Sequence, residues 1–382
     1  MFNINILKKH RTIILVALVV LIIKTVLFVW ATHNFNFVTH PGTNWLSLWD
    51  RWDAGVYKTI AQSGYNFINI KLDFWAFLSH FPPLYPLTMA LTMVIMSRLV
   101  SISLANTGIL VSLVSIIIAS VLLYKLVYLE FKNKKIAWFS VIFLNLYPTS
   151  FFTISVHSES LFLLLTIWSF YSLKKEHYFL AGLAAAGAIL TRFVGVIFLP
   201  VYALYFLYTY KKSGFNLKTF CPFLLSIAGL IVYLVINKFY FGNYFYFFTE
   251  KLSFNTTKHL ILPFKETYFA LLAIFKNSNF WNQAFMTTQG WNSIFTLFAL
   301  VITFLGIKKI NWIYTAYSFG SILLFASLSW GISNARYTLS VFPIFIVLAF
   351  IKNKIVLSFI LTAFAFMLLY FTKVYTSGAW AF

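Results

Sequence analysis

The sequence predicts an all-α polytopic membrane protein, and two observations carry this prediction. Hydrophobic residues make up 61% of the 382 residues and charged residues 10%, and the mean hydropathy of +0.85 is far from that of soluble domains. Apolar runs of roughly membrane-spanning length also recur along the chain. They predict a bundle of about 11 transmembrane helices, over Thr12–Trp30, Pro82–Met96, Ile102–Leu123, Ile136–Thr153, Ser158–Leu173, Tyr178–Tyr208, Phe220–Ile236, Trp291–Ile307, Trp312–Leu328, Tyr337–Ile351 and Val356–Phe371.

Two stretches between these runs are too polar to cross a membrane throughout. Residues 31–80 form a predicted first external loop that carries interfacial helices, and residues 240–290 form a second loop. The run Tyr178–Tyr208 is too long for one span and is predicted to be a hairpin broken near Arg192. No internal repeat or low-complexity linker divides the chain, so we expect one membrane-embedded domain over residues 1–382.

The basic residues predict the orientation of the bundle. The net charge is +21, but the bases fall in short clusters between apolar runs, which is typical of cytoplasmic loops rather than of a nucleic-acid surface. Both long loops then face the non-cytoplasmic side. The chain must cross an odd number of times between His80 and Lys125, yet two apolar runs lie there. We therefore predict that Pro82–Met96 is re-entrant or interfacial.

The stretch Trp45–Tyr65 holds two of the eight acidic residues. Read as one helix, its tryptophans and aliphatic residues fall on one stripe. A tryptophan-rich face with charged flanks is typical of a helix that lies flat in a membrane interface. A solvated helix with paired charges and a catalytic surface are both open interpretations. The charged flanks carry Asp50, Asp53 and Tyr57 on one side and Arg51 and Lys58 on the other.

Three charges lie within or beside apolar runs on the predicted non-cytoplasmic side: Glu159, Arg192 and Arg336. Inserting such a residue costs roughly 3 kcal/mol, so intramembrane charges tend to pair or to serve a site. One interpretation is a structural ion pair, such as Glu159 with Arg192, that locks two helices together. The alternative is a polar cavity open to the outer face, and the position of Asp50 and Asp53 on the same side favours it.

Five short motifs follow one another between residues 49 and 345. They are Arg51-Trp52-Asp53-Ala54-Gly55 with Tyr57, Pro83-Leu84-Tyr85-Pro86-Leu87, Pro148 to Phe152 with Ser158-Glu159-Ser160-Leu161-Phe162, Thr191-Arg192 with Gly195, and Arg336-Tyr337 with Phe342-Pro343. Together they resemble the signature of the PIG-V-like mannosyltransferases, which are multi-spanning glycosyltransferases of the GT-C architecture. The chain departs from that family at His157, where a tyrosine is common, and at Phe193-Val194. No match is found in residues 240–290.

The resemblance implies a GT-C-like bundle. It also implies that the donor is a polyprenyl- or dolichyl-phosphate sugar and that this sugar is mannose. The leaving lipid phosphate needs cations nearby, and the attacking hydroxyl needs a base. We predict Asp53 as this base, with Asp50 as the second choice or as its orienting partner. Guanidinium suits phosphate geometry, so Arg192 and Arg336 are predicted to hold the donor phosphate. The other substrate-binding candidates are Glu159, which orients an arginine or binds sugar hydroxyls, His157, Tyr57 and Arg51.

No cofactor is predicted. A divalent cation held by Asp50 and Asp53 is an alternative, but a metal-free mechanism is preferred because Arg192 and Arg336 offer compensating charge. The single cysteine, Cys221, excludes an internal disulfide and a cysteine metal cluster. Walker A, H-E-x-x-H and G-x-S-x-G motifs are absent, which argues against an ATP-driven pump, a zinc protease and a serine hydrolase.

Two other functions are open. A lipid or sugar-lipid flippase would line its path with Glu159, Arg192 and Arg336, and an assembly subunit would keep the fold without catalysis. The predicted partners of the enzyme are the donor, a lipid or glycan acceptor and the bilayer, without nucleic acid. Short loops indicate a bacterial plasma membrane with the site facing outside. In a eukaryote, the resemblance implies the endoplasmic reticulum membrane and a GPI-anchor precursor as acceptor.

Overall fold

The computed structural model of the chain describes residues 4–37, 40, 43–66, 72–249, 259–276, 288–329 and 333–381. Within these ranges every regular element is a helix, apart from one isolated antiparallel bridge between Leu260 and Leu328. The all-α membrane class is confirmed, because five helices in the described residues are long and apolar enough to cross a membrane. They are α1 (Ile4–Asn34), α5 (Leu104–Phe131), α9 (Phe198–Ser213) with the turn before it, α10 (Leu217–Phe241) and α18 (Lys354–Thr376).

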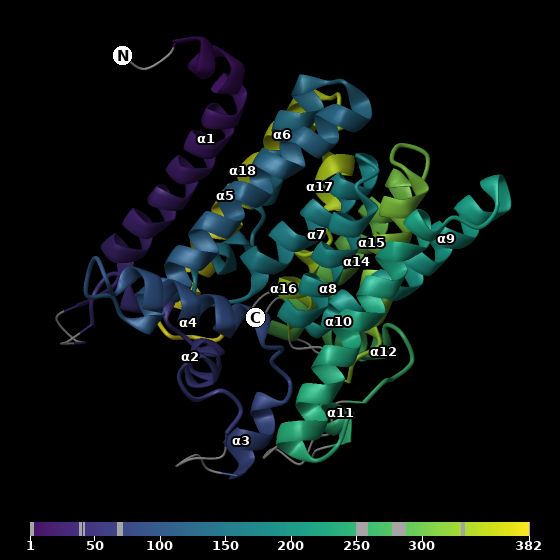
Figure 1. Ribbon diagram of the computed structural model, residues 1–382. Coiled ribbons are helices and arrows are strands. Elements are labelled where there is room, and N and C mark those ends of the chain that lie inside the picture. The colour runs from purple at the N-terminus through teal and green to yellow at the C-terminus, as the bar shows by residue number, and fades with distance from the viewer. Residues whose placement is uncertain are drawn as a thin grey trace.

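Shorter helices complete the bundle. The α6 and α7 helices pack on α5, and α8 packs between α7 and α10. The α15 helix packs on α9, and both α14 and α15 contact the late short helices α16 and α17. In Figure 1 the α3 helix (Leu72–Leu78), the α11 helix and the loop that follows α1 lie at one end of the bundle. The α5–α6 and α9–α10 connections lie at the other end. The bounds are α6 Lys134–Leu146, α7 Glu159–Lys174, α8 Tyr178–Thr191, α11 Tyr246–Thr249, α12 Lys265–Lys276, α14 Thr288–Gly306, α15 Trp312–Ala326, α16 Asn334–Thr338 and α17 Pro343–Leu348.

Asparagine caps begin several helices at the end that carries the predicted cytoplasmic connections. In each case the side-chain oxygen accepts a hydrogen bond from a backbone N–H of the first turn. Such a cap satisfies donors that a helix leaves unpaired. The basic clusters therefore lie in short, capped turns between helices. The caps are Asn133 for α6, Asn216 for α10, Asn311 for α15 and Asn353 for α18.

The proline-rich run Pro82–Met96 forms a single short helix, α4 (Leu84–Met96). Its 13 residues rise only about 20 Å, less than the roughly 30 Å of a bilayer core. Figure 1 shows α4 lying across the end of α5 rather than along it. The re-entrant or interfacial position of this run stays a prediction, and α5 is the next helix that is long and apolar enough to cross a membrane.

The predicted single helix over Trp45–Tyr65 is wrong. The chain forms a 3-10 turn, η1 (Ser47–Trp49), and then α2 (Ala54–Ser63), with a break between them. At the break Trp52 takes a left-handed φ of 54°, a conformation that ends a right-handed helix. The predicted apolar stripe is therefore split: Trp49 is fully buried, whereas Trp52 is 45% exposed. The first loop carries helices as expected, and α3 (Leu72–Leu78) follows α2.

The predicted hairpin over Tyr178–Tyr208 is confirmed. The α8 helix ends at Thr191, Arg192 has an extended backbone, and a 3-10 turn, η3 (Phe193–Ile197), leads into α9. Gly195 permits this tight reversal. A Cβ atom placed there would lie 2.7 Å from the carbonyl carbon of Ala188 and from the backbone nitrogen of Ile189, closer than real Cβ contacts. The reversal leaves Arg192 at the break between two helices.

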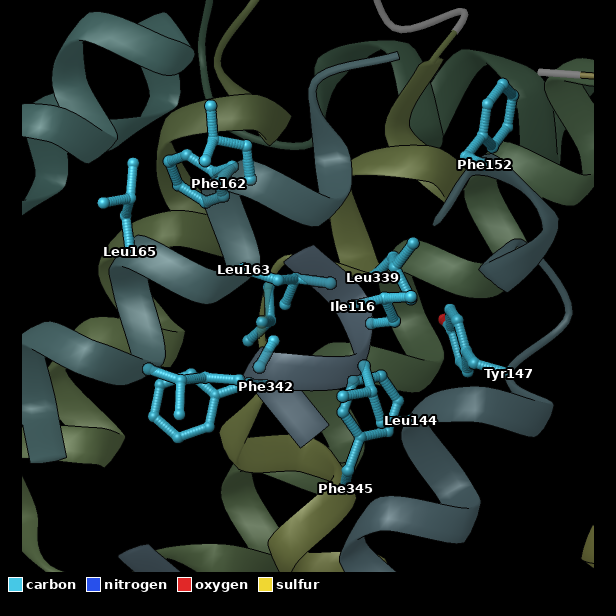
Figure 2. Close-up of a cluster of buried hydrophobic side chains, with 14 of the residues drawn as sticks. Ile116, Leu144, Tyr147, Phe152, Phe162, Leu163, Leu165, Leu339, Phe342 and Phe345 are labelled. Atoms are coloured by element: carbon cyan, nitrogen blue, oxygen red, sulfur yellow. The ribbon is translucent and has the colours of Figure 1, made fainter. Parts of the chain in front are cut away.

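The hydrophobic core fixes the late helices against the early ones. Figure 2 shows Ile116 of α5, Leu144 of α6, Tyr147 just after α6, and Leu163 of α7 around Leu339 and Phe342, which lie between α16 and α17. These side chains are all buried. The Tyr147 hydroxyl lies 2.7 Å from the Thr338 hydroxyl oxygen, so the polar end of one core residue holds the last residue of α16. This packing sets the position of the neighbouring Arg336.

Candidate active site

The candidate site is built on an ion pair between Asp53 and Arg336. The Arg336 Nη1 atom donates a hydrogen bond of 2.6 Å to Asp53 Oδ2. Asp53 immediately precedes α2 and occupies its N-cap position, where an aspartate commonly accepts a bond from the first turn. It makes no such cap bond. Its carboxylate, 24% exposed in the side chain, points to the guanidinium instead.

Glu159 joins both arginines. Its Oε1 atom accepts hydrogen bonds from Arg336 Nε and from Arg192 Nη1, and its side chain is fully buried. Glu159 is the first residue of α7, whereas Arg192 lies at the α8 break and Arg336 on α16. Glu159 therefore ties three segments into one charged cluster. The predicted Glu159–Arg192 pair exists, and it is part of this larger network.

Aromatic rings support the two guanidinium groups. The Arg336 guanidinium lies 4.7 Å from the centroid of the Phe152 ring, and that of Arg192 lies 5.2 Å from the centroid of the Tyr337 ring. A cation over an aromatic face is attracted by the ring quadrupole, more so away from water. These contacts support the arginines in addition to their carboxylate partners.

A cavity of about 160 Å³ opens beside the cluster. Asp53, Arg192 and Arg336 all line it, so a ligand inside reaches the carboxylate and both guanidinium groups. Aromatic residues make up much of the remaining wall. This combination of a mostly apolar wall with a few convergent polar groups is typical of a small-molecule site. Its other lining residues include Tyr57, Phe81, Phe193, Tyr233, Phe247 and Trp380.

Tyr57 and Ser158 lie beside the charged cluster and are bonded to each other. The Tyr57 hydroxyl lies 2.7 Å from Ser158 Oγ, and Arg192 Nη1 donates a 3.3 Å hydrogen bond to the same oxygen. Burial raises the pKa of Tyr57, so this phenol stays protonated at neutral pH. Tyr57 therefore acts as a neutral hydrogen-bonding group that fixes α2 against α7.

The charges around Asp53 keep it ionised. Burial raises its pKa, but the charges of Arg336 and His157 and the hydrogen bond from Arg336 together outweigh burial, and the pKa lies below the ordinary value for aspartate. His157 behaves differently. Burial, followed by the positive charge of Arg336, lowers the pKa of His157 to about 3, so its ring is neutral at neutral pH. Its Nδ1 lies 2.9 Å from Ser155 Oγ, and its buried Nε2 has no hydrogen-bond partner among the described residues.

The structure brings together six of the eight predicted site residues and separates two. Asp53, Tyr57, His157, Glu159, Arg192 and Arg336 belong to one cluster. Asp50 instead pairs with Lys58, with 2.5 Å between Oδ2 and Nζ. Arg51 Nη2 donates a 3.3 Å bond to the carbonyl oxygen of Thr376 at the end of α18. The break at Trp52 explains the separation, because it rotates these two residues away from Asp53.

The sequence reasoning missed several residues that shape the site. Trp380 lines the cavity from the segment after α18, and no pattern in the sequence links it to Asp53. Lys24 lies inside the first apolar run, is fully buried, and donates a 3.3 Å bond to the Ser150 carbonyl oxygen. That bond anchors η2 (Ser150–Ile154), which carries Phe152. A lysine within an apolar run was the available signal for Lys24.

Comparison with known proteins identifies the fold. A family profile described as dolichyl-phosphate-mannose-protein mannosyltransferase matches residues 80–237, and the resemblance to the PIG-V-like family stays a prediction. A search of curated protein sequences gave no match. The crystal structure of ArnT from Cupriavidus metallidurans bound to undecaprenyl phosphate matches with 12% identity and a TM-score of 0.53, over 93% of this chain and 62% of that one.

A second solved structure is the archaeal oligosaccharyltransferase AglB from Archaeoglobus fulgidus, in complex with an inhibitory peptide and a dolichol-phosphate. It has 12% identity and a TM-score of 0.44, over 94% of this chain and 56% of that one. The chain thus spans less than two thirds of the length of either protein. The likeness to ArnT shows that this chain has the fold of the GT-C membrane glycosyltransferases.

Proposed function

We propose that this chain is an integral-membrane glycosyltransferase that moves a sugar from a polyprenyl- or dolichyl-phosphate donor to an acceptor hydroxyl. The observation that carries the proposal is the contact of Asp53 with Arg336 at the wall of a cavity that Arg192 also lines. One group there can accept a proton, and two can hold a phosphate. The GT-C fold and the matched family profile support the same reaction class.

In the proposed reaction Asp53 is the general base. Its carboxylate takes the proton of the acceptor hydroxyl as the oxygen attacks the anomeric carbon of the donor sugar. The bond from that carbon to the phosphate oxygen breaks, and the lipid phosphate leaves with the electron pair. The lowered pKa of Asp53 keeps the carboxylate ionised and ready to accept the proton. Arg192 and Arg336 hold the phosphate oxygens through charge-assisted hydrogen bonds.

The charge balance of the cluster links proton transfer to Asp53 with the departure of the lipid phosphate. In the resting site two carboxylates, Asp53 and Glu159, neutralise two guanidinium groups. When Asp53 accepts the proton it loses its charge and its hold on Arg336. At the same moment the leaving phosphate gains a negative charge. Arg336 is then free to pair with the phosphate, so stabilisation moves to where charge develops in the transition state.

The finer features of the proposal rest on resemblance. The motifs shared with PIG-V-like mannosyltransferases and the description of the matched family profile support mannose as the sugar. Basic clusters in the α5–α6 and α9–α10 connections support an orientation with the cavity on the non-cytoplasmic side. A bacterial plasma membrane, with the site facing outside and a lipid or glycan acceptor, is the setting we propose.

The test uses the purified full-length protein in detergent with polyprenyl-phosphate mannose. The wild-type protein should release lipid phosphate and transfer the sugar, and Asp53→Asn should reduce transfer by about 100-fold or more while keeping the thermal unfolding profile. Glu130→Gln is the control, because Glu130 pairs with Lys174 at 2.8 Å at the far end of α5. Wild-type activity in Asp53→Asn would refute the base assignment. Movement of the intact sugar-lipid across vesicles without transfer would identify a flippase instead.

A further inference from the structure

Two tryptophans meet beside the candidate base. The Trp52 and Trp380 rings lie edge to face, with centroids 4.8 Å apart and an interplanar angle of 75°. Trp380 lines the cavity that Asp53 also lines, and Trp52 is the residue before Asp53. The side chains are 45% and 37% exposed, so Trp380 belongs to the cavity wall and Trp52 extends the aromatic surface from it toward the outside.

The backbone holds Trp52 in this place at a conformational cost. Its φ of 54° is in the left-handed region, which a bulky side chain rarely occupies. Such outliers persist where the surrounding structure fixes them, and they concentrate at functional sites. Here two contacts fix the surroundings: the Tyr375 hydroxyl donates a 3.3 Å bond to the Trp49 carbonyl oxygen, and Arg51 bonds to the carbonyl oxygen of Thr376. They join the η1–α2 break to the end of α18.

The exposed faces of this pair suit a pyranose ring. One face of a pyranose is a patch of C–H groups, and an indole ring offers a flat apolar surface with a polar N–H edge. Two indoles at a steep angle form a corner that contacts a sugar from two sides. The nearby Asp53 carboxylate accepts hydrogen bonds from hydroxyl groups of the same ring.

The geometry also separates the acceptor from the donor. The attacking hydroxyl must approach the anomeric carbon on the side away from the leaving phosphate. Arg336, which holds the phosphate in the proposed function, bonds to the Asp53 carboxylate, and Trp52 precedes Asp53 in the chain and contacts Trp380. The tryptophan pair makes no bond to the charged cluster among the contacts of the described residues and is available to the acceptor. The body of the acceptor therefore extends from Asp53 toward Trp52 and Trp380.

We infer that Trp52 and Trp380 form an acceptor subsite that holds a sugar ring, so that the acceptor is a glycan or glycolipid. This inference rests on the proposed function for the direction of transfer. An alternative for exposed tryptophans is anchoring in the membrane interface. Trp45 provides the comparison, because it lies in the same loop and is 50% exposed, but it packs on Phe28 of α1 at 5.7 Å between ring centroids and does not line this cavity.

The test measures transfer from polyprenyl-phosphate mannose to two acceptors, the disaccharide mannobiose and a serine-containing peptide. Trp380→Ala and Trp52→Ala should each raise the KM for mannobiose by about tenfold, with kcat and the KM for the donor little changed. Trp380→Phe should restore most of the affinity. Trp45→Ala should behave as the wild-type protein. Equal KM values for mannobiose in Trp380→Ala and Trp45→Ala, or transfer to the peptide alone, would overturn the subsite.

A binding measurement separates failure of the subsite from failure of the proposed function. Equilibrium dialysis with radiolabelled mannobiose needs no donor and no turnover. Binding by the wild-type protein that Trp380→Ala weakens supports the subsite, even if no donor is cleaved. Equal binding by the wild-type protein and Trp380→Ala, in a protein that does cleave the donor, refutes the subsite and leaves the proposed function standing.

Discussion

Asp53 and Arg336 are 283 residues apart in the sequence, yet their side chains are joined by a hydrogen bond of 2.6 Å. The contact connects the segment between α1 and α2 to the short helix α16 near the end of the chain. Through Glu159 it also reaches Arg192. The proposed reaction, its pH dependence and its sensitivity to substitution all depend on this bond.

The first prediction concerns pH. Transfer requires ionised Asp53, so its rate falls as the pH drops through the pKa of this carboxyl. Arg336 holds that pKa below the ordinary value, near 4 for a free aspartate, and the wild-type profile should be flat down to acidic pH. In Arg336→Gln the effect of burial dominates and raises the pKa. The acid limb of the residual activity should then move toward neutral pH.

The measurement is the pH profile of sugar transfer between about pH 4 and 8 for the wild-type protein, Arg336→Gln and Arg336→Lys. The lysine variant keeps a cation near Asp53, so its acid limb should lie between those of the other two proteins. An identical acid limb in all three proteins would show that Asp53 does not set the pH dependence.

The second prediction concerns stability. Glu159 is the shared partner of Arg192 and Arg336, and it is fully buried. Glu159→Gln leaves both guanidinium groups without this carboxylate, and breaking a buried pair in this way costs about 3–5 kcal/mol. Thermal unfolding in detergent should show a clear loss of stability, together with a loss of transfer. Glu176→Gln removes an exposed carboxylate from the turn after α7 and should unfold nearly as the wild-type protein does.

The third prediction compares two glycines from the shared motifs. Gly195→Ala places a methyl group 2.7 Å from the backbone of Ala188, so η3 must shift and Arg192 with it. We expect the KM for the donor to rise and the protein to lose about 1–3 kcal/mol of stability. Gly55→Ala meets no atom within 4 Å and should be tolerated. Equal effects of the two substitutions would argue against the role given to the α8–α9 reversal.

The fourth prediction concerns metal removal. Asp50 and Asp53 do not face a common point, because each is paired with a different cation, Lys58 and Arg336. Two guanidinium groups already supply positive charge beside the cavity. Sugar transfer should therefore be unchanged after dialysis against a chelator. Loss of transfer that added magnesium or manganese restores would replace this assignment with a metal-assisted one.

Much of the fold followed from the sequence for clear physical reasons. Long apolar runs can lie in a membrane only as helices, and a charge inside them, such as Arg192, marks a break or a site. The distribution of basic loops was enough to predict that Asp53, Glu159 and Arg336 lie on the same side of the membrane. The contacts among them are a separate matter, because hydropathy contains no information on which helices adjoin.

The errors have equally specific causes. Helical periodicity treats every residue as right-handed, so it could not show that Trp52 turns the chain and separates Asp50 from Asp53. The role of Trp380 depends on packing between two segments at opposite ends of the sequence. No local pattern records such a contact.

The spread of the charged cluster along the chain bears on biosynthesis. Asp53 and Glu159 leave the ribosome long before Arg336, and until α16 enters the membrane Glu159 lacks one of its two guanidinium partners. A partly translated chain therefore contains an incomplete charged cluster. Under the proposed function, sugar transfer should begin only after α16 has joined that cluster, since Arg336 comes from one of the last helices to be made.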